Sequence, residues 1–284
     1  MSESTFRVTP VITLDDGNVT STTVAEDEYA AWDGGTTYAA GESVIYGHKI
    51  YTGLLAANLN NNPATATNYW QEIGPTNAWA MFDTAKDTVT HSGSGDLVVV
   101  LEPGEVDSIY VDGLTGVDTV HVVILDAPGG TSVYDETITL AGATVPAWEG
   151  VFATPSYTKT KVVFRKAPKY AACEITVTIS GSDVHCARLQ VGTSNILGSA
   201  LAGATVTLVR RDASRRMDVR LWLDNSQLPK IAQFLEELGD TACIWQASDK
   251  ANMDLFLMLG TYAELAVEVP WASNSYCSLQ IEGA

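Results

Sequence analysis

Basic residues are almost absent from the first half of this sequence. Residues 1–150 contain only Arg7, Lys49 and Lys86 against 21 acidic residues, whereas residues 151–284 contain 13 of each sign, so the formal net charge of −18 belongs to the first half. A broad basic face for the phosphate backbone of a nucleic acid is therefore excluded. The change in charge along the chain predicts modules with different surroundings.

Several other features are missing. There is no apolar run of 18 residues and no glycine period, which excludes a membrane-spanning helix and a collagen-like chain. Residues 1–6 lack the basic and apolar regions of a secretory signal, so we expect folding in the cytoplasm. The four cysteines have no C-x-x-C spacing, and His185-Cys186 has no further ligand near it in sequence. We therefore expect free thiols, no metal site and no cofactor.

What is present is a β-rich pattern. β-Branched runs separated by turn signals cover 106–111, 119–125, 132–140, 161–165 and 173–180, which predicts an antiparallel β-sandwich-like domain over residues 77–182. Similar runs continue through residues 183–284, predicted as a second β-rich domain. Whether these are two domains or one larger unit stays open.

One helix interrupts this second series of strands. Apolar residues recur at helical spacing from about residue 227 to 238, with Pro229 in the first turn and Gly239 at the end. Ser226 is the predicted N-cap. The fold class is thus mostly β with a single helix.

Residues 1–28 are predicted to be an N-terminal arm. Residues 5–14 alternate apolar and polar side chains like a strand, and Pro10 suits an edge. Pairing with another subunit and a simple solvated linker are equally compatible with this pattern.

Residues 29–75 form a block dense in aromatic residues. Seven of the 24 aromatic residues of the chain lie here: Tyr29, Trp32, Tyr38, Tyr46, Tyr51, Tyr69 and Trp70. A segment of this length without disulfides needs large rings to build a core. Part of the aromatic density is therefore structural.

The order of residues in this block resembles the short chitin-binding modules attached to bacterial chitinases and cellulases. The matching positions are Trp32, Thr36/Thr37, Tyr38, Gly41-Glu42, Val44, Tyr46, Tyr51, Pro63 and Trp70. Glu42 stands where Asp is commoner, and one extra residue precedes Tyr38. The resemblance implies a carbohydrate-binding module, because flat aromatic rings fit the apolar faces of sugars.

The carbohydrate-binding residues implied by the resemblance are Trp32, Tyr38, Tyr46, Tyr51 and Trp70. The motif does not separate rings that contact sugar from rings that fill the core. If Tyr69 and Trp70 lie in a strand, one of them faces outward.

The whole chain resembles, more loosely, tail-tip, baseplate and fibre proteins of tailed bacteriophages, in which small glycan-binding modules join β-rich structural domains. This resemblance rests on the N-terminal arm, the 74–83 junction and the serial strands. It implies a non-enzymatic virion protein, assembled in the host cytoplasm, that forms homo-oligomers, contacts other tail proteins and binds host surface glycan. Two alternatives are a glycan-degrading enzyme with an appended module and a purely structural assembly protein.

Catalytic patterns are weak. Asp135-Glu136 and Glu236-Glu237 are adjacent carboxylates, expected respectively on opposite faces of a strand and on the solvated side of a helix. None of the four histidines accompanies a G-x-S-x-G elbow. We predict no catalytic residues. The arginines of the run from Arg210 to Arg220 are interpreted as a solvated turn, with a subunit contact as the functional alternative.

Overall fold

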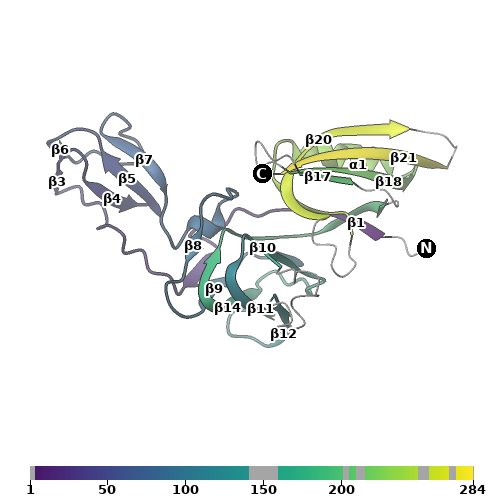
Figure 1. Cartoon of the computed structure of the whole chain (residues 1–284), viewed down its shortest axis with the longest axis horizontal. Helices are drawn as coiled ribbons and strands as arrows, with labels where there is room; N and C mark the ends of the chain where they lie inside the picture. The colour runs from purple at the N-terminus through teal and green to yellow at the C-terminus, as the bar shows by residue number, and fades with distance from the viewer. Residues whose placement is uncertain are drawn as a thin grey trace, which may run out of the picture.

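The fold was obtained as a computed structural model, which describes residues 4–140, 159–200, 205–208, 215–248, 256–268 and 273–283. The mostly β prediction is confirmed: the described residues form antiparallel sheets and one α-helix. Figure 1 shows an elongated molecule, with strands β3–β7 forming a small lobe at one end. No helix in the described ranges has the length and apolar character needed to cross a bilayer.

A β-sandwich occupies the middle of the molecule (Figure 1). One sheet has the order β12-β11-β14-β9-β2, with β8 also paired to β14, and the other has the order β13-β10-β15. The strands are β2 (Val19–Thr22), β8 (Thr90–His91), β9 (Leu97–Leu101), β10 (Ser108–Asp112), β11 (Thr115–Leu125), β12 (Ser132–Thr139), β13 (Lys161–Arg165), β14 (Glu174–Cys186) and β15 (Arg188–Gly192). Alternate residues such as Val120, Val122 and Ile124 enter the core.

The strands of the second β series form a barrel together with the N-terminal strand. The strands of this sheet are β1 (Ser4–Pro10), β16 (Asn195–Ala200), β17 (Thr205–Leu208), β18 (Arg215–Asp224), β19 (Cys243–Gln246), β20 (Leu257–Glu268) and β21 (Asn274–Gly283). They follow the order β16-β1-β19-β20-β21-β18-β17, and an additional pairing of β16 with β18 closes six of them into a barrel. Phe6 stacks on Trp245 in its interior, where both side chains are fully buried.

The N-terminal strand belongs to this barrel. Residues Ser4–Pro10 pair with β16 on one side and β19 on the other, and the apolar side chains of Phe6 and Val8 are fully buried. The expected arm is thus a strand within its own chain, and neither a solvated linker nor an arm reaching another subunit describes it. Its alternation predicted the strand, but its partners lie about 190 to 240 residues away in sequence, beyond the reach of a local pattern.

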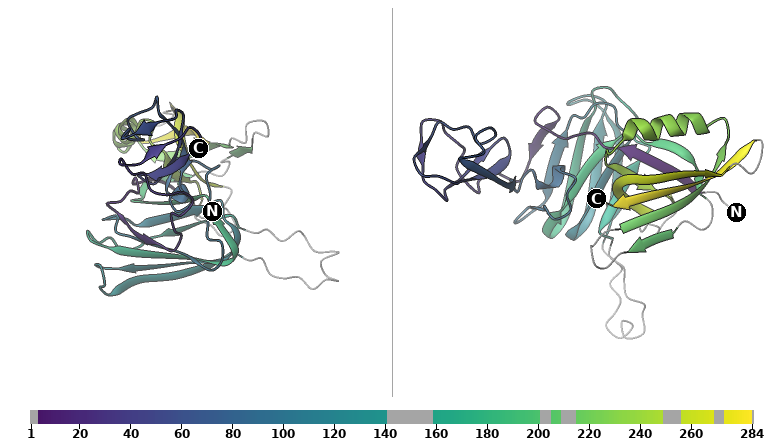
Figure 2. Two further views of the ribbon diagram at one scale, coloured as in Figure 1. Left: turned by 90° about the vertical axis from the view of Figure 1, so that its left-hand side faces the viewer. Right: turned by 90° about the horizontal axis from the view of Figure 1, so that it is seen from above.

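The helix prediction is confirmed, but its predicted N-cap is wrong. Helix α1 spans Leu228–Leu238 and ends at Gly239, which has φ of +51°. Ile231, Leu235 and Leu238 join the apolar cluster that fills the barrel, and Figure 2 shows the helix lying across it. The N-cap is Gln227, which makes no side-chain capping bond. In the preceding turn, the Asp224 carboxylate accepts the N–H of Ser226.

Barrel and sandwich share a buried contact. Tyr110 of the sandwich packs in one apolar cluster with Ile244, Leu257 and Leu259 of the barrel. The main chain crosses the same boundary, where Ile12 N–H donates to Val191 O at 2.9 Å. Strands β10 and β15 are buried along their whole length because both of their faces are covered.

The small lobe is built from residues 29–75. A three-stranded sheet, β4-β5-β7, stands beside a two-stranded one, β3-β6. The strands are β3 (Thr37–Tyr38), β4 (Ser43–Tyr46), β5 (Lys49–Gly53), β6 (Asn58–Leu59) and β7 (Trp70–Pro75), and a 3₁₀ turn at Ala80–Phe82 follows. We call this lobe the aromatic module. Figure 2 shows it standing apart from the barrel, beyond the sandwich.

Candidate functional site

Two of the five predicted carbohydrate-binding residues form the core of the aromatic module. Trp70 is 2% exposed and Tyr51 is 6% exposed, and both pack on Val44. The Trp70 indole N–H donates to Asn61 O at 2.8 Å, which fixes the ring inside. Rings buried in this way cannot present a face to a sugar, so we correct the prediction and assign Tyr51 and Trp70 to the core. Tyr69 is the more exposed member of the Tyr69-Trp70 pair.

Trp32 and Tyr46 remain partly exposed and contact each other. Their rings meet edge to face, with centroids 5.5 Å apart and planes at 87°. The main chain positions Trp32 beside β4, because its N–H donates to Ile45 O at 2.8 Å. Trp32 is also distinguished from Trp70 by its indole N–H, which makes no hydrogen bond to the described residues. The two residues are partly exposed, although the indole Nε1 of Trp32 is itself buried.

Tyr38 lies between the two groups. It is partly buried, and its ring meets Trp70 edge to face at 5.2 Å. Its hydroxyl accepts the N–H of Asp33 at 2.8 Å, which holds the turn that follows Trp32. Tyr38 therefore connects the core to the partly exposed pair and orients the segment that carries Trp32.

Asparagine side chains line the loop beside this aromatic pair. Asn62 Nδ2 donates to the Tyr46 hydroxyl at 2.8 Å. A Cβ atom placed on Gly34 would lie 3.0 Å from Asn60 Oδ1 and 3.4 Å from the Trp32 ring, so Asn60 and Trp32 both lie close to Gly34. The amide groups supply both donors and acceptors next to an aromatic surface, the combination that sugar hydroxyls and sugar faces require. No role was predicted for Asn60 or Asn62 from the sequence.

The aromatic module also exposes large apolar side chains. Five of the nine found on the described surface lie in this short segment: Tyr29, Leu54, Leu55, Leu59 and Ile73. Leu59 is 52% exposed although it lies in β6. The sequence analysis did not separate these positions from buried ones. Leu54 and Leu55 are adjacent in sequence, and a contiguous exposed apolar patch is typical of a surface that binds another molecule.

Charged side chains of the module bind nearby residues of the same segment. Asp33 accepts hydrogen bonds from the N–H of Gly35 at 2.9 Å and from the Thr36 hydroxyl at 3.0 Å. These bonds lower the pKa of the Asp33 carboxyl, which keeps it ionised. Lys49 forms an ion pair with Glu72 at 2.7 Å and lies directly opposite Tyr46 in the register of β4 and β5.

A histidine fastens the aromatic module to the sandwich. His48, at the tip of the β4–β5 hairpin, stacks on Trp79 with ring centroids 3.8 Å apart. Its Nδ1 lies 2.9 Å from Glu26 Oε2 and its Nε2 lies 2.5 Å from Asp16 Oδ1. Partial burial lowers the pKa of His48, but the hydrogen bonds to the two carboxylates raise it by more, so the net shift is upward. We call the contacts of His48 with Trp79, Glu26 and Asp16 the histidine clamp, and the sequence did not predict it.

Other residues considered from the sequence form ordinary contacts. His121 pairs with Asp135 across β11 and β12 at 2.8 Å. Arg216 pairs with Asp218 at 3.1 Å and Arg220 with Glu268 at 3.4 Å. Both arginines lie in strand β18, so the interpretation of this part of the run as a turn is corrected. Arg210 and Arg211 lie outside the described residues. All four cysteines are free and buried, as predicted.

Comparisons with known proteins give few likenesses. No family model and no curated protein matches the chain. The solved structure of CpGH89CBM32-6 produced by Clostridium perfringens is 11% identical, with 40% of this chain and 83% of that chain covered and a TM-score of 0.28. Reduced XRCC1 bound to the DNA polymerase β catalytic domain is 14% identical, with coverage of 65% and 99% and a TM-score of 0.28. TM-scores this low support no argument about fold or function.

Proposed function

We propose that this chain is a non-enzymatic structural protein of a phage tail tip, baseplate or fibre, whose aromatic module binds host cell-surface glycan. The observation that carries the proposal is the partly exposed Trp32–Tyr46 pair with Asn60 and Asn62 beside it. The rings contact the apolar face of a sugar, and the amides exchange hydrogen bonds with its hydroxyls. The virion role rests on the resemblance of the β-rich architecture to tail proteins.

The charge distribution selects among glycans. Residues 29–75 contain three acidic residues and one lysine, and Asp33 beside Trp32 is kept ionised. Anionic polymers are repelled from such a surface, whereas uncharged sugars are not. We therefore propose a neutral glycan, such as one built from N-acetylated hexosamines.

Binding by one module is expected to be weak, since the aromatic surface is small. Several copies in a homo-oligomer then act together, because the second binding event is intramolecular. The sandwich and barrel, joined by the buried cluster around Tyr110, supply a stiff support for that arrangement.

Retention on insoluble polysaccharide tests the proposal. The purified chain is passed over chitin and over peptidoglycan, and Trp32→Ala is compared with Tyr170→Ala, an aromatic residue 38% exposed on the sandwich side of the chain. We expect loss of retention only for Trp32→Ala. Equal retention of both variants contradicts glycan binding at this site, and soluble oligosaccharide released from either polymer contradicts a non-enzymatic role.

A second candidate function is protein docking through the module. The exposed side chains of Leu54, Leu55 and Leu59 favour it. In that case the chain shows no affinity for polysaccharide, while a Leu54→Ser/Leu59→Ser variant fails to assemble with the other proteins of the particle. Glycan retention that survives this double substitution favours the first proposal.

A further inference from the structure

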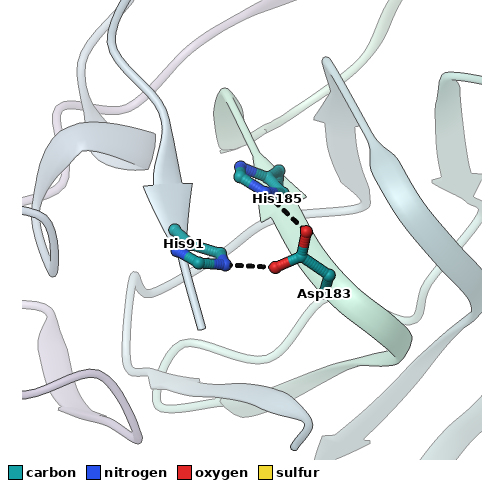
Figure 3. Close-up of side chains that lie close together, drawn as sticks. All are labelled: His91, Asp183 and His185. Carbon is teal, nitrogen blue, oxygen red and sulfur yellow. Dashed lines mark hydrogen bonds and ion pairs between the residues drawn. The ribbon is translucent and has the colours of Figure 1, made fainter. Parts of the chain in front are cut away.

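Two histidines and an aspartate, distant in sequence, meet on one face of the sandwich. His91 lies in β8 and His185 in β14, where the two residues are direct partners in the antiparallel register. Their rings stack with centroids 4.2 Å apart and planes at 13°. Asp183, two residues before His185, places its carboxylate against both rings, as Figure 3 shows.

The distances bring three ligand atoms together. His91 Nε2 lies 2.5 Å from Asp183 Oδ1, and His185 Nε2 lies 3.6 Å from Asp183 Oδ2. One ligand atom from each residue lies within 4.8 Å of the other two. Ligand atoms around a tetrahedral zinc ion, with bonds of about 2.0–2.1 Å, are about 3.4 Å apart. Small side-chain rotations convert one spacing into the other.

The backbone of strands β8 and β14 places the three side chains close together. Asp183 and His185 are both accessible to solvent while Val184 between them is buried, so the two side chains lie on the outer face of the sheet. Asp183 has a left-handed φ of +60°, at an irregularity of β14 where Gly116 packs against the carbonyl groups of Ser182 and Asp183. This close approach leaves no room for a Cβ at Gly116 and holds the turn beneath the carboxylate.

The three side chains are also open to solvent. Those of His91, Asp183 and His185 are 42%, 71% and 34% exposed. Two imidazoles and one carboxylate are donors that suit zinc, nickel, copper or iron, and the open side leaves positions for water.

We propose that His91, Asp183 and His185 form a binding site for a divalent transition-metal ion, with zinc as the representative ion. The ion joins β8 to β14. Strand β8 is itself bonded to Asn77, whose Oδ1 accepts the His91 N–H at 2.8 Å and whose Nδ2 donates to His91 O at 2.8 Å. Asn77 follows the last strand of the aromatic module, so the ion stabilises the junction that supports the module.

The sequence analysis predicted no metal site because the three ligands do not form a motif. It considered His185 with Cys186 instead. Cys186 is fully buried in the core of the sandwich, and its side chain lies on the opposite face of β14 from that of its neighbour His185.

Calorimetric titration with zinc chloride tests the site, using the full chain without a histidine tag and after treatment with a chelator. The chain offers a matched control, because His121 and Asp135 form an exposed histidine–carboxylate pair on the same sheet without a second histidine. We expect one ion per chain, at least tenfold weaker binding in His91→Ala, His185→Ala and Asp183→Asn, and unchanged binding in His121→Ala.

Cobalt provides a second readout that does not depend on stability. Substitution with Co²⁺ is expected to give visible absorption bands in the parent chain and in His121→Ala, and to give none in His91→Ala/His185→Ala. Circular dichroism checks that each variant is folded. Binding that is equally tight in the parent chain and in the double variant overturns the proposal, as does an equal loss in His121→Ala.

Discussion

A buried ion pair joins two strands of the sandwich, and its removal has a predictable cost. Arg188 of β15 donates to Asp112 of β10, and their side chains are only 4% and 7% exposed. Burial raises the pKa of the Asp112 carboxyl, but the Arg188 guanidinium, the Gly113 N–H and the Lys161 ammonium together lower it by more, so the net shift is downward and the group stays ionised. In Arg188→Met this carboxylate loses its main partner while remaining inside the protein.

Breaking a buried pair from one side costs about 3–5 kcal/mol. We expect a value at the lower end, because the Lys161 ammonium also lowers the pKa of Asp112 and the Gly113 N–H still donates to it. At about 2–4 °C per kcal/mol for a unit of this size, the melting temperature falls by roughly 6–12 °C. Urea unfolding followed by circular dichroism gives the free energy directly.

The double variant Arg188→Met/Asp112→Asn distinguishes the loss of the ion-pair attraction from the cost of leaving a buried carboxylate without its partner. Because it removes the buried carboxylate as well, it is expected to recover a substantial part of the stability lost in the single variant. A loss below about 1 kcal/mol in Arg188→Met, or a double variant less stable than the single one, refutes this reasoning.

Three further predictions concern the histidine clamp, the glycine beneath Asp183 and the helix start. Because the pKa of His48 is raised in the folded protein, protonated His48 stabilises the fold fully below the unfolded pKa of about 6.5, and this stabilisation is lost as the pH rises through the higher folded pKa. Proton NMR titration measures the folded pKa, and a value below about 6.5 contradicts the prediction. Gly116→Ala adds a Cβ 2.3 Å from Asp183 O at a φ of +69°, so we expect a loss above about 2 kcal/mol in urea unfolding, and a neutral variant contradicts the close packing. Ser226→Ala changes stability by less than about 0.5 kcal/mol, because Gln227 is the N-cap; a loss of about 1 kcal/mol restores Ser226 to that role.

Local patterns predicted the elements well. The runs at 119–125 and 161–165 lie in strands β11 and β13, and the spacing of Ile231, Leu235 and Leu238 placed helix α1. Alternation and helical periodicity report which face of an element is buried, and that information is carried by neighbours in sequence.

Partners distant in sequence were not predictable from the same patterns. Nothing near Phe6 indicates that its strand closes a barrel with residues beyond 190, and His91 gives no sign of His185. The aromatic module illustrates a second limit. Trp32 and Trp70 are equivalent in the motif, but the indole N–H of Trp70 is bonded inside the core while the ring of Trp32 stays partly exposed. Only the three-dimensional packing distinguishes the two.

Fluorine NMR of the full chain, with its seven tryptophans replaced by 5-fluorotryptophan, tests glycan binding at Trp32 most directly. Assignment by single substitution identifies the Trp32 resonance, and a chitin oligosaccharide is then added. The account predicts a saturable shift of the Trp32 resonance, with little change at the buried Trp245 in the barrel. Resonances that all stay fixed, or a shift confined to tryptophans outside the aromatic module, would contradict glycan binding at the Trp32–Tyr46 pair.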